Sequence, residues 1–175
     1  MVQHAERADA RANRQRLIAA AQELFRERGL DAEMKEIAER AGLGVGTIYR
    51  NFPTKDDLFA AIIGEAVTEI QTVADEAAQI DDPVEAIRHH LLGGLGVSER
   101  YGDVMMALLG GKLPPACVEQ FQALKAREDP VAPIVRAGIE RGIFRPDIDP
   151  TIVGTGVHLA MVPWAYQELR ATHTR

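Results

Sequence analysis

The chain has 175 residues, enough for one medium-sized domain or for a small domain joined to a larger one. A single cysteine excludes an internal disulfide framework, and the longest apolar stretch, residues 153–166, is too short and interrupted to span a membrane. The net charge of −6 hides an asymmetry, since residues 1–55 carry ten Lys and Arg against eight Asp and Glu, and the remainder ten against eighteen. With a polar start that lacks a signal peptide, we expect a cytoplasmic protein that meets a polyanion with its mildly basic head.

Apolar residues recur at helical spacing and no segment shows the alternation of a strand, so the sequence predicts an all-α protein. Glycine, proline and a Thr-x-x-Asp capping pattern mark the ends of the first elements. The helices expected in the first half are 11–28 before Gly29, 33–41 before Gly42, 45–51 before Pro53, and 54–79 beginning at Thr54 with Asp57 three residues on.

Three Asp-Pro pairs follow, each typical of a helix start with Asp as the N-cap and Pro at the first helical position. They begin at Asp82, Asp129 and Asp149 and predict helices near 83–92, 130–142 and 150–170. Weaker patterns predict helices at 98–109, closed by Gly110-Gly111, and at 115–127. Pro163 should kink or end the last helix. The second part would then be a bundle of about six helices, counted from the helix at 54–79.

Residues 42–58, GLGVGTIYRNFPTKDDL, place glycines at three alternate positions before a polar cluster. A nucleotide-binding glycine loop would follow a buried strand, whereas an amphipathic helix precedes this one, so we reject that interpretation. Two short helices joined by a tight glycine turn and braced by a third form a helix-turn-helix, whose second helix enters the major groove of DNA. Gly42 would end the first helix sharply, Gly44 would permit the turn, and Gly46 would let the backbone approach a phosphate.

The segments RQRLIAAAQELFRERG and MKEIAERAGLGVGTIYRNFPTKDDLFAAII, within residues 13–63, resemble the tetracycline-repressor (TetR) family of bacterial transcriptional regulators. The pattern A-G-x-x-x-G-T-x-Y-x-x-F-x-x-K-x-x-L of that family falls on Ala41, Gly42, Gly46, Thr47, Tyr49, Phe52, Lys55 and Leu58. Beyond residue 80 the resemblance supports architecture only. It implies a helix-turn-helix DNA-binding domain at 1–53, with an N-terminal arm at 1–12, and an effector-binding and dimerisation domain at 54–175.

The resemblance also implies which side chains meet DNA. Thr47 and Tyr49 would contact phosphates or bases, and Lys55 would clamp a phosphate. Arg50 could pair bidentately with guanine, or be a plain surface charge, and Tyr49 could instead be a half-buried core residue. The predicted DNA-binding residues are Gly44, Val45, Gly46, Thr47, Tyr49, Arg50, Asn51 and Lys55.

The sequence departs from the family pattern at two places beside the expected DNA surface. Glu33 stands where a Ser or Thr often caps the second helix, and its carboxylate would repel a phosphate. Gly44 and Val45 replace the commoner Ser-Lys pair. Binding could therefore use an N-terminal arm, unless that arm is disordered, through Arg7, Arg11, Arg14 and Arg16.

One helix-turn-helix makes few base contacts, so we expect a homodimer on a pseudo-palindromic operator in double-stranded DNA. By resemblance the last two helices form the dimer interface, and the apolar residues there are Val131, Val135, Ile139, Val153, Val157 and Met161. The middle helices carry residues that could line a pocket for a small hydrophobic effector or simply fill the core. These are Met105, Met106, Leu109, Phe121 and Leu124, with Trp164 further on.

The function expected from these features is a ligand-responsive repressor that an effector releases from its operator. An effector-independent regulator or an activator is the alternative. An enzyme is not expected, because no nucleophile–base pair or paired carboxylates point to catalysis, and no cofactor is implied. We expect no metal site, since His89 and His90 do not share a helix face and no carboxylate lies at ligand spacing. Cys117 is expected to be buried and inert.

Overall fold

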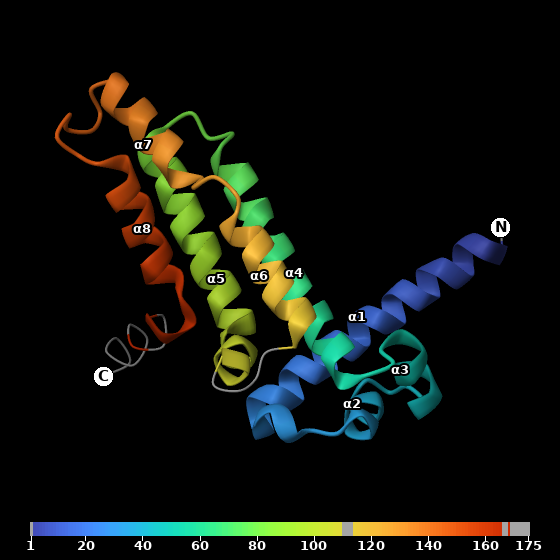
Figure 1. Ribbon diagram of the computed structural model, residues 1–175. Coiled ribbons are helices and arrows are strands. Elements are labelled where there is room, and N and C mark those ends of the chain that lie inside the picture. The colour runs from blue at the N-terminus through green and yellow to red at the C-terminus, as the bar shows by residue number, and fades with distance from the viewer. Residues whose placement is uncertain (1, 110–113, 166–167, 169–175) are drawn as a thin grey trace. The chain divides into compact units, whose positions relative to one another are not determined.

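The computed structural model describes residues 2–109, 114–165 and 168, and over these residues it contains helices and no strand (Figure 1). The all-α prediction is therefore confirmed for the described part of the chain. The elements in chain order are α1 (Val2–Arg28), the 3-10 turn η1 (Gly29–Asp31), α2 (Met34–Arg40), α3 (Val45–Asn51), α4 (Lys55–Ala77), α5 (Pro83–Leu109), α6 (Pro115–Lys125), α7 (Val131–Glu140) and α8 (Pro150–Met161).

The chain divides into two compact units. The first unit comprises residues 1–64 and 103–119, and the second comprises residues 65–102 and 120–175. Helices α4 and α5 each contribute residues to both units, whereas α1, α2 and α3 belong to the first unit and α7 and α8 to the second. The functional boundary expected after residue 53 is a different kind of division and stays a prediction.

Local capping interactions begin several helices as the sequence predicts. The carboxylates of Asp82 and Asp149 each accept a backbone N–H from the first turn of α5 and α8 at 2.8 Å. At α4 the backbone N–H of Thr54 donates to Asp57 at 2.9 Å, and the N–H of Asp57 donates to the Thr54 hydroxyl at 3.1 Å. Asp129 also accepts a backbone N–H, but α7 begins one residue later than expected, after Pro130.

Two helices are longer than the sequence analysis predicts. Helix α1 begins at Val2, so the segment expected as an arm continues the helix. The helices expected at 83–92 and 98–109 are one continuous α5. The glycines between residues 92 and 98 lie within this helix and do not break it. They allow close packing instead, since a Cβ on Gly93 would overlap Val73 of α4. Helices α4 to α8 therefore make five in the described residues, not six. Gly110-Gly111, expected to close α5, lies outside the described residues.

Small residues at every fourth position of α5 let α8 and the residues after it approach closely. A Cβ on Gly94 would overlap the sulfur of Met161, and a Cβ on Gly102 would lie 3.2 Å from the ring of Pro163. Between them, the Ser98 hydroxyl donates to the carbonyl of Met161. The α5–α8 contact thus depends on the absence of large side chains on this face of α5.

Helix α8 ends at Met161, because the chain is extended at Val162 immediately before Pro163. The prediction that Pro163 interrupts the last helix is confirmed, and the physical reason is the clash of a proline ring with the preceding helical turn. Helical turns resume at 163–165, and residues 166–167 and 169–175, which the sequence analysis assigned in part to this helix, lie outside the described residues. Among the described helices, none is both long enough and apolar enough to cross a bilayer.

Candidate nucleic-acid interface

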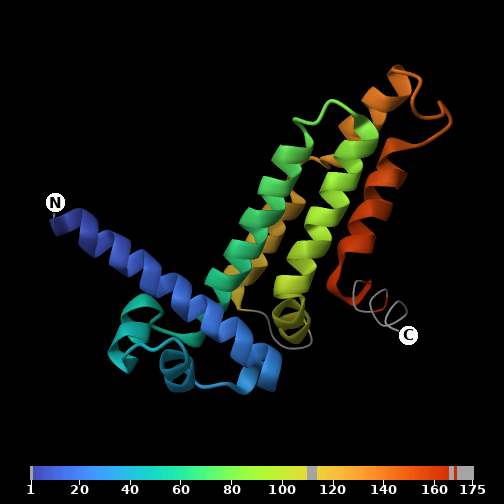
Figure 2. The same cartoon turned by 180° about the vertical axis from the view of Figure 1, so that it is seen from behind.

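The first three helices form a small core of their own, and we call α1, α2 and α3 the head (Figure 2). Figure 2 shows α2 and α3 as two short helices beside the much longer α1. Each of the three contributes fully buried apolar side chains that recur at helical spacing. They are Leu17, Ile18, Ala21, Leu24 and Phe25 from α1, Ile37 and Ala38 from α2, and Ile48 from α3.

The turn between α2 and α3 is held by its own backbone and by one side chain from α1. Gly42 has φ of 65°, a left-handed conformation that favours glycine, and the N–H of Leu43 donates to the carbonyl of Ala38 at 2.9 Å. The guanidinium of Arg16 donates to the carbonyl of Ala41 at 2.6 Å. Arg16 therefore braces this turn, and its predicted contact with DNA stays a prediction, since a guanidinium has five donors.

Helix α3 has one buried face and one exposed face. Ile48 and the cap residue Phe52 are buried, as the sequence predicts. Val45 and Tyr49, one turn apart, are both exposed large hydrophobic residues. The alternative that Tyr49 belongs to the core is therefore wrong. An exposed apolar pair on a helix that is firmly anchored from behind is available to a partner.

Gly44 and Gly46 lie at the start of this exposed face. Gly44 is the N-cap of α3 with φ of −72°, which any residue adopts, so the backbone of the turn does not require a glycine there. At both positions an added Cβ would meet nothing within 4 Å. No packing inside the described residues therefore explains these glycines.

The polar side chains of α3 contact their own helix. The guanidinium of Arg50 donates to the carbonyl of Gly46 and to the hydroxyl of Thr47, both at 3.2 Å. The side-chain amide of Asn51 donates to the carbonyl of Thr47 at 2.8 Å. These contacts align Arg50 along the exposed helix surface, from which it can turn outward without disturbing the core.

Lys55 lies at the first position of α4 and makes an internal contact that the sequence analysis missed. Its ammonium donates to the carbonyl of Leu30, 25 residues away, and lies 5.7 Å and 5.9 Å from the ring centres of Phe25 and Phe59. These interactions tie η1 and α1 to α4. Because an ammonium has three donors, this role does not exclude the predicted phosphate contact, which stays a prediction.

Ion pairs neutralise part of the charge on the head. Arg40 donates to Glu27 at 2.9 Å and to Glu23 at 3.3 Å, and the hydrogen bond from Arg40 is the largest cause that lowers the pKa of Glu27. Glu36 accepts the backbone N–H of Glu33 at 3.0 Å, which lowers the pKa of Glu36 and caps α2. The guanidinium of Arg14 lies 4.5 Å from the ring centre of Phe52, so this arginine also braces α3.

Helices α2 and α3 are short, are joined by a turn at a glycine and are braced by α1, and α3 has an exposed outer face. This arrangement defines a helix-turn-helix protein. Residues 17–62 match the family model described as bacterial regulatory proteins, tetR family. An HTH-type transcriptional regulator of Staphylococcus aureus (strain USA300) is 45% identical over 58 residues, which are 33% of this chain and 31% of that relative. The match therefore spans about a third of the length of this curated relative.

Likeness over most of the chain comes from solved structures. The TetR family transcriptional regulator PfmR from Thermus thermophilus superposes with a TM-score of 0.70 at 27% identity, covering 86% of this chain and 84% of that one. AibR, solved in complex with isovaleryl coenzyme A and operator DNA, has a TM-score of 0.66 at 21% identity, covers 89% and 86% of the two chains, and shows a shared fold. Residues 17–62 therefore carry a tetR-family helix-turn-helix domain, and the chain shares the fold of TetR family regulators over most of its length.

The residues predicted to line an effector pocket are divided between the two compact units. Met105, Met106 and Leu124 are half-buried, and Trp164 is exposed. The two methionines belong to the first compact unit, and Leu124 and Trp164 to the second. The side chains of Leu109 and Phe121 lie outside the described part of the structure. An effector site at these residues stays a prediction.

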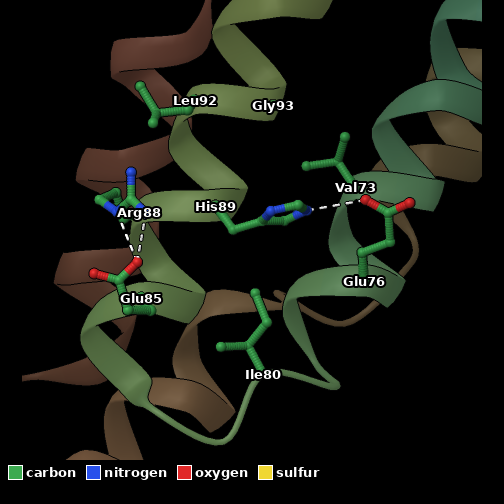
Figure 3. Close-up of a pocket in the computed structure, with 8 residues that line it drawn as sticks. All are labelled: Val73, Glu76, Ile80, Glu85, Arg88, His89, Leu92 and Gly93. Atoms are coloured by element: carbon green, nitrogen blue, oxygen red, sulfur yellow. Dashed lines mark hydrogen bonds and ion pairs between the residues drawn. The ribbon is translucent and has the colours of Figure 1, made fainter.

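A different hollow, of about 300 Å³, opens between α4 and the start of α5 (Figure 3). His89 points from α5 toward Glu76 on α4 and lies 2.9 Å from its carboxylate. Arg88 pairs with Glu85 one turn away at 2.5 Å. The ionic groups of this groove are thus already paired with one another, and none of the predicted pocket residues lines it.

The predicted dimer residues divide by burial. Val131 and Val135 of α7 are fully buried within the chain, so their side chains are not available to a partner and their assignment to the interface is wrong. Helical spacing identifies an apolar face but not whether the same chain or another covers it. Ile139, Val153, Val157 and Met161 are half-buried. The outward side chains of α8 that the sequence analysis missed are Ile152, which is 72% exposed, and Leu159.

Proposed function

We propose that this protein is a transcriptional regulator that inserts α3 into the major groove of operator DNA. The observation that carries the proposal is the two-faced α3, buried at Ile48 and open at Gly46 and Tyr49. The small residue at the start of the helix admits a phosphate close to the backbone, and the exposed side chains reach base edges.

The proposed regulator acts as a homodimer. The outward face of α8 carries Ile152 and Leu159 with Gly156 between them, where an added Cβ would meet nothing within 4 Å. Large exposed apolar residues beside an open glycine suit close packing against an identical helix. A two-fold pair would place its α3 helices about 34–36 Å apart, one helical turn of DNA, on a pseudo-palindromic site.

The proposed regulation is release of a repressor from DNA by a small hydrophobic effector, within the cytoplasm. AibR, which shares the fold, was solved with both isovaleryl coenzyme A and operator DNA. Suppose that the effector and the DNA bind two different conformations of this chain. The effector then lowers the affinity for the operator, and the operator must lower the affinity for the effector by the same factor. An effector-independent regulator is the alternative, and equal operator affinity with and without every effector tested would favour it.

Fluorescence anisotropy on duplexes from upstream of the gene for this protein tests DNA binding. We expect saturable binding that weakens with salt, since each phosphate contact contributes about −0.9 to the slope of log K against log salt. Tyr49→Ala should weaken binding about tenfold or more, as when an aromatic at the centre of an interface is truncated. Leu92→Ala removes an exposed apolar side chain from the second unit and should leave binding unchanged. Equal affinities of the two variants would refute the assigned interface.

The oligomeric state is tested separately by light scattering. Ile152→Glu places a charge on the outward face of α8 and should convert a dimer to a monomer. Val84→Glu makes the same kind of change at an exposed position of α5 and should leave the dimer intact. A wild-type monomer, or a dimer that survives Ile152→Glu, would contradict this interface without bearing on α3.

A further inference from the structure

Helix α3 turns two large apolar side chains to the outside of the head. Val45 is 38% exposed and Tyr49 is 50% exposed, and they lie one turn apart on the same side of the helix. On the opposite side, Ile48 is fully buried and anchors α3 to the head. The outward pair therefore lies outside the core, and the packing behind it fixes its position.

The polar side chains of α3 are engaged with their own helix. The guanidinium of Arg50 donates to the carbonyl of Gly46 and to the hydroxyl of Thr47. The side-chain amide of Asn51 donates to the carbonyl of Thr47. The helix has the sequence VGTIYRN and so carries no carboxylate that would repel DNA. Without rearrangement of Arg50 and Asn51, the first turn of α3 presents an apolar side chain, that of Val45, to a partner.

The surroundings of Val45 allow its short side chain to reach a base. Val45 is the first residue of α3 and stands between Gly44 and Gly46, where an added Cβ would meet nothing within 4 Å. A valine touches a base edge only if the backbone comes close to the DNA, and the bare positions on both sides permit that approach. The first residues of a recognition helix are also those that meet base edges in the major groove.

An exposed valine selects its partner by chemistry, because its side chain can neither donate nor accept a hydrogen bond. Among the base edges in the major groove of DNA, the C5-methyl group of thymine is the apolar one. We propose that Val45 contacts the C5-methyl group of a thymine in each operator half-site, so that α3 selects a T·A pair at that position. This inference rests on the proposed binding of DNA by α3 and adds which base one side chain reads.

The proposed contact has a size and a signature. Removing about one methyl group from water in each half-site contributes about threefold to tenfold in affinity. An apolar contact releases no counterions, so its loss should leave the slope of log K against log salt unchanged. A valine that acted on DNA by bringing phosphate contacts into place would change that slope when truncated.

The test uses the full chain and a duplex that the wild type selects from a random library. Each thymine of this site is replaced in turn by deoxyuridine, which lacks only the C5-methyl group, and affinity is measured by fluorescence anisotropy. We expect one thymine in each half-site whose replacement weakens wild-type binding by the factor given above. Val45→Ala should bind the unmodified site more weakly, lose most of its sensitivity to deoxyuridine at that position, and keep the wild-type salt slope.

Val84→Ala is the matched control, because it makes the same substitution at an exposed position in the first turn of α5, in the second unit. It should keep both the wild-type affinity and the sensitivity to deoxyuridine. Because Val45 is exposed, Val45→Ala should melt as the wild type does, which circular dichroism checks.

The outcomes separate this inference from the proposed function. If the wild type selected no sequence from the library, specific DNA binding by α3 and the thymine contact would both be refuted. A selected site without any thymine sensitive to deoxyuridine would overturn the thymine contact alone. So would a Val45→Ala variant that kept the full wild-type sensitivity, since another side chain would then contact the methyl group.

Discussion

Replacing Gly46 with alanine should raise the stability of the protein and weaken its binding to DNA. Gly46 is the second residue of α3, its φ is not positive, and an added Cβ would meet nothing within 4 Å. Alanine in a helix is favoured over glycine by about 0.5–1 kcal/mol, and we expect the lower end because the site is in the first turn. For a chain of this size, that stabilisation raises the melting temperature by roughly 1–3 °C.

The same methyl group should weaken DNA binding. If the start of α3 lies against a phosphate, the added carbon is forced into a packed interface, at a cost of about 1–3 kcal/mol. That cost corresponds to roughly tenfold to hundredfold weaker binding. Urea denaturation and anisotropy on the same preparation measure the two effects, and they should have opposite signs.

Gly96→Ala is the matched control. Gly96 lies within α5, where an added Cβ would meet only the flexible end of Arg100 at 3.4 Å, an ordinary contact. This variant should gain stability in the same way and keep wild-type DNA affinity. If Gly46→Ala gained stability and bound DNA as tightly as the wild type, close backbone approach at α3 would be refuted.

Two further substitutions and a measurement of stability against pH test contacts elsewhere. Arg16→Ala removes the donor to the Ala41 carbonyl and should destabilise the head by about 1–2 kcal/mol, measured by urea denaturation. Gly154→Ala would drive a methyl into the carboxylate of Asp129 and should cost about 1–3 kcal/mol by the same measurement. Burial is the largest cause that lowers the pKa of His90 in the folded chain, to about 4, so the unfolded chain binds a proton first as pH falls below 6.5. Stability should therefore fall by roughly 1–2 kcal/mol between pH 6.5 and pH 5.

Each of these three predictions has a control variant. Arg11→Ala removes the same charge from an exposed position of α1 and should change stability little, so equal losses for Arg11 and Arg16 would contradict the brace. Gly156→Ala, with open space around it, should be neutral or stabilising, and a loss equal to that of Gly154→Ala would point away from the Asp129 clash. His90→Gln should flatten the pH dependence, and an unchanged slope would assign it to other groups.

Much of the head could be predicted because its determinants are local. The turn glycine Gly42 and the Thr54–Asp57 capping box act over three or four residues, which is the range that a sequence pattern reports directly. The spacing of Ile48 and Phe52 assigned the buried face of α3 for the same reason. Fixed spacings over residues 41–58 were also specific enough to indicate the family.

The contacts that only the tertiary structure decided join distant segments. Arg16 reaches a carbonyl 25 residues away, and His90 meets a ring 68 residues away. Long polar side chains choose among acceptors by geometry that no periodicity records, and so the contact of Arg16 with the Ala41 carbonyl was not predicted. Helical spacing identified the apolar face of α7, but only packing showed that the same chain buries Val131 and Val135. An amphipathic pattern specifies that a face must be covered, and the arrangement of the other helices decides what covers it.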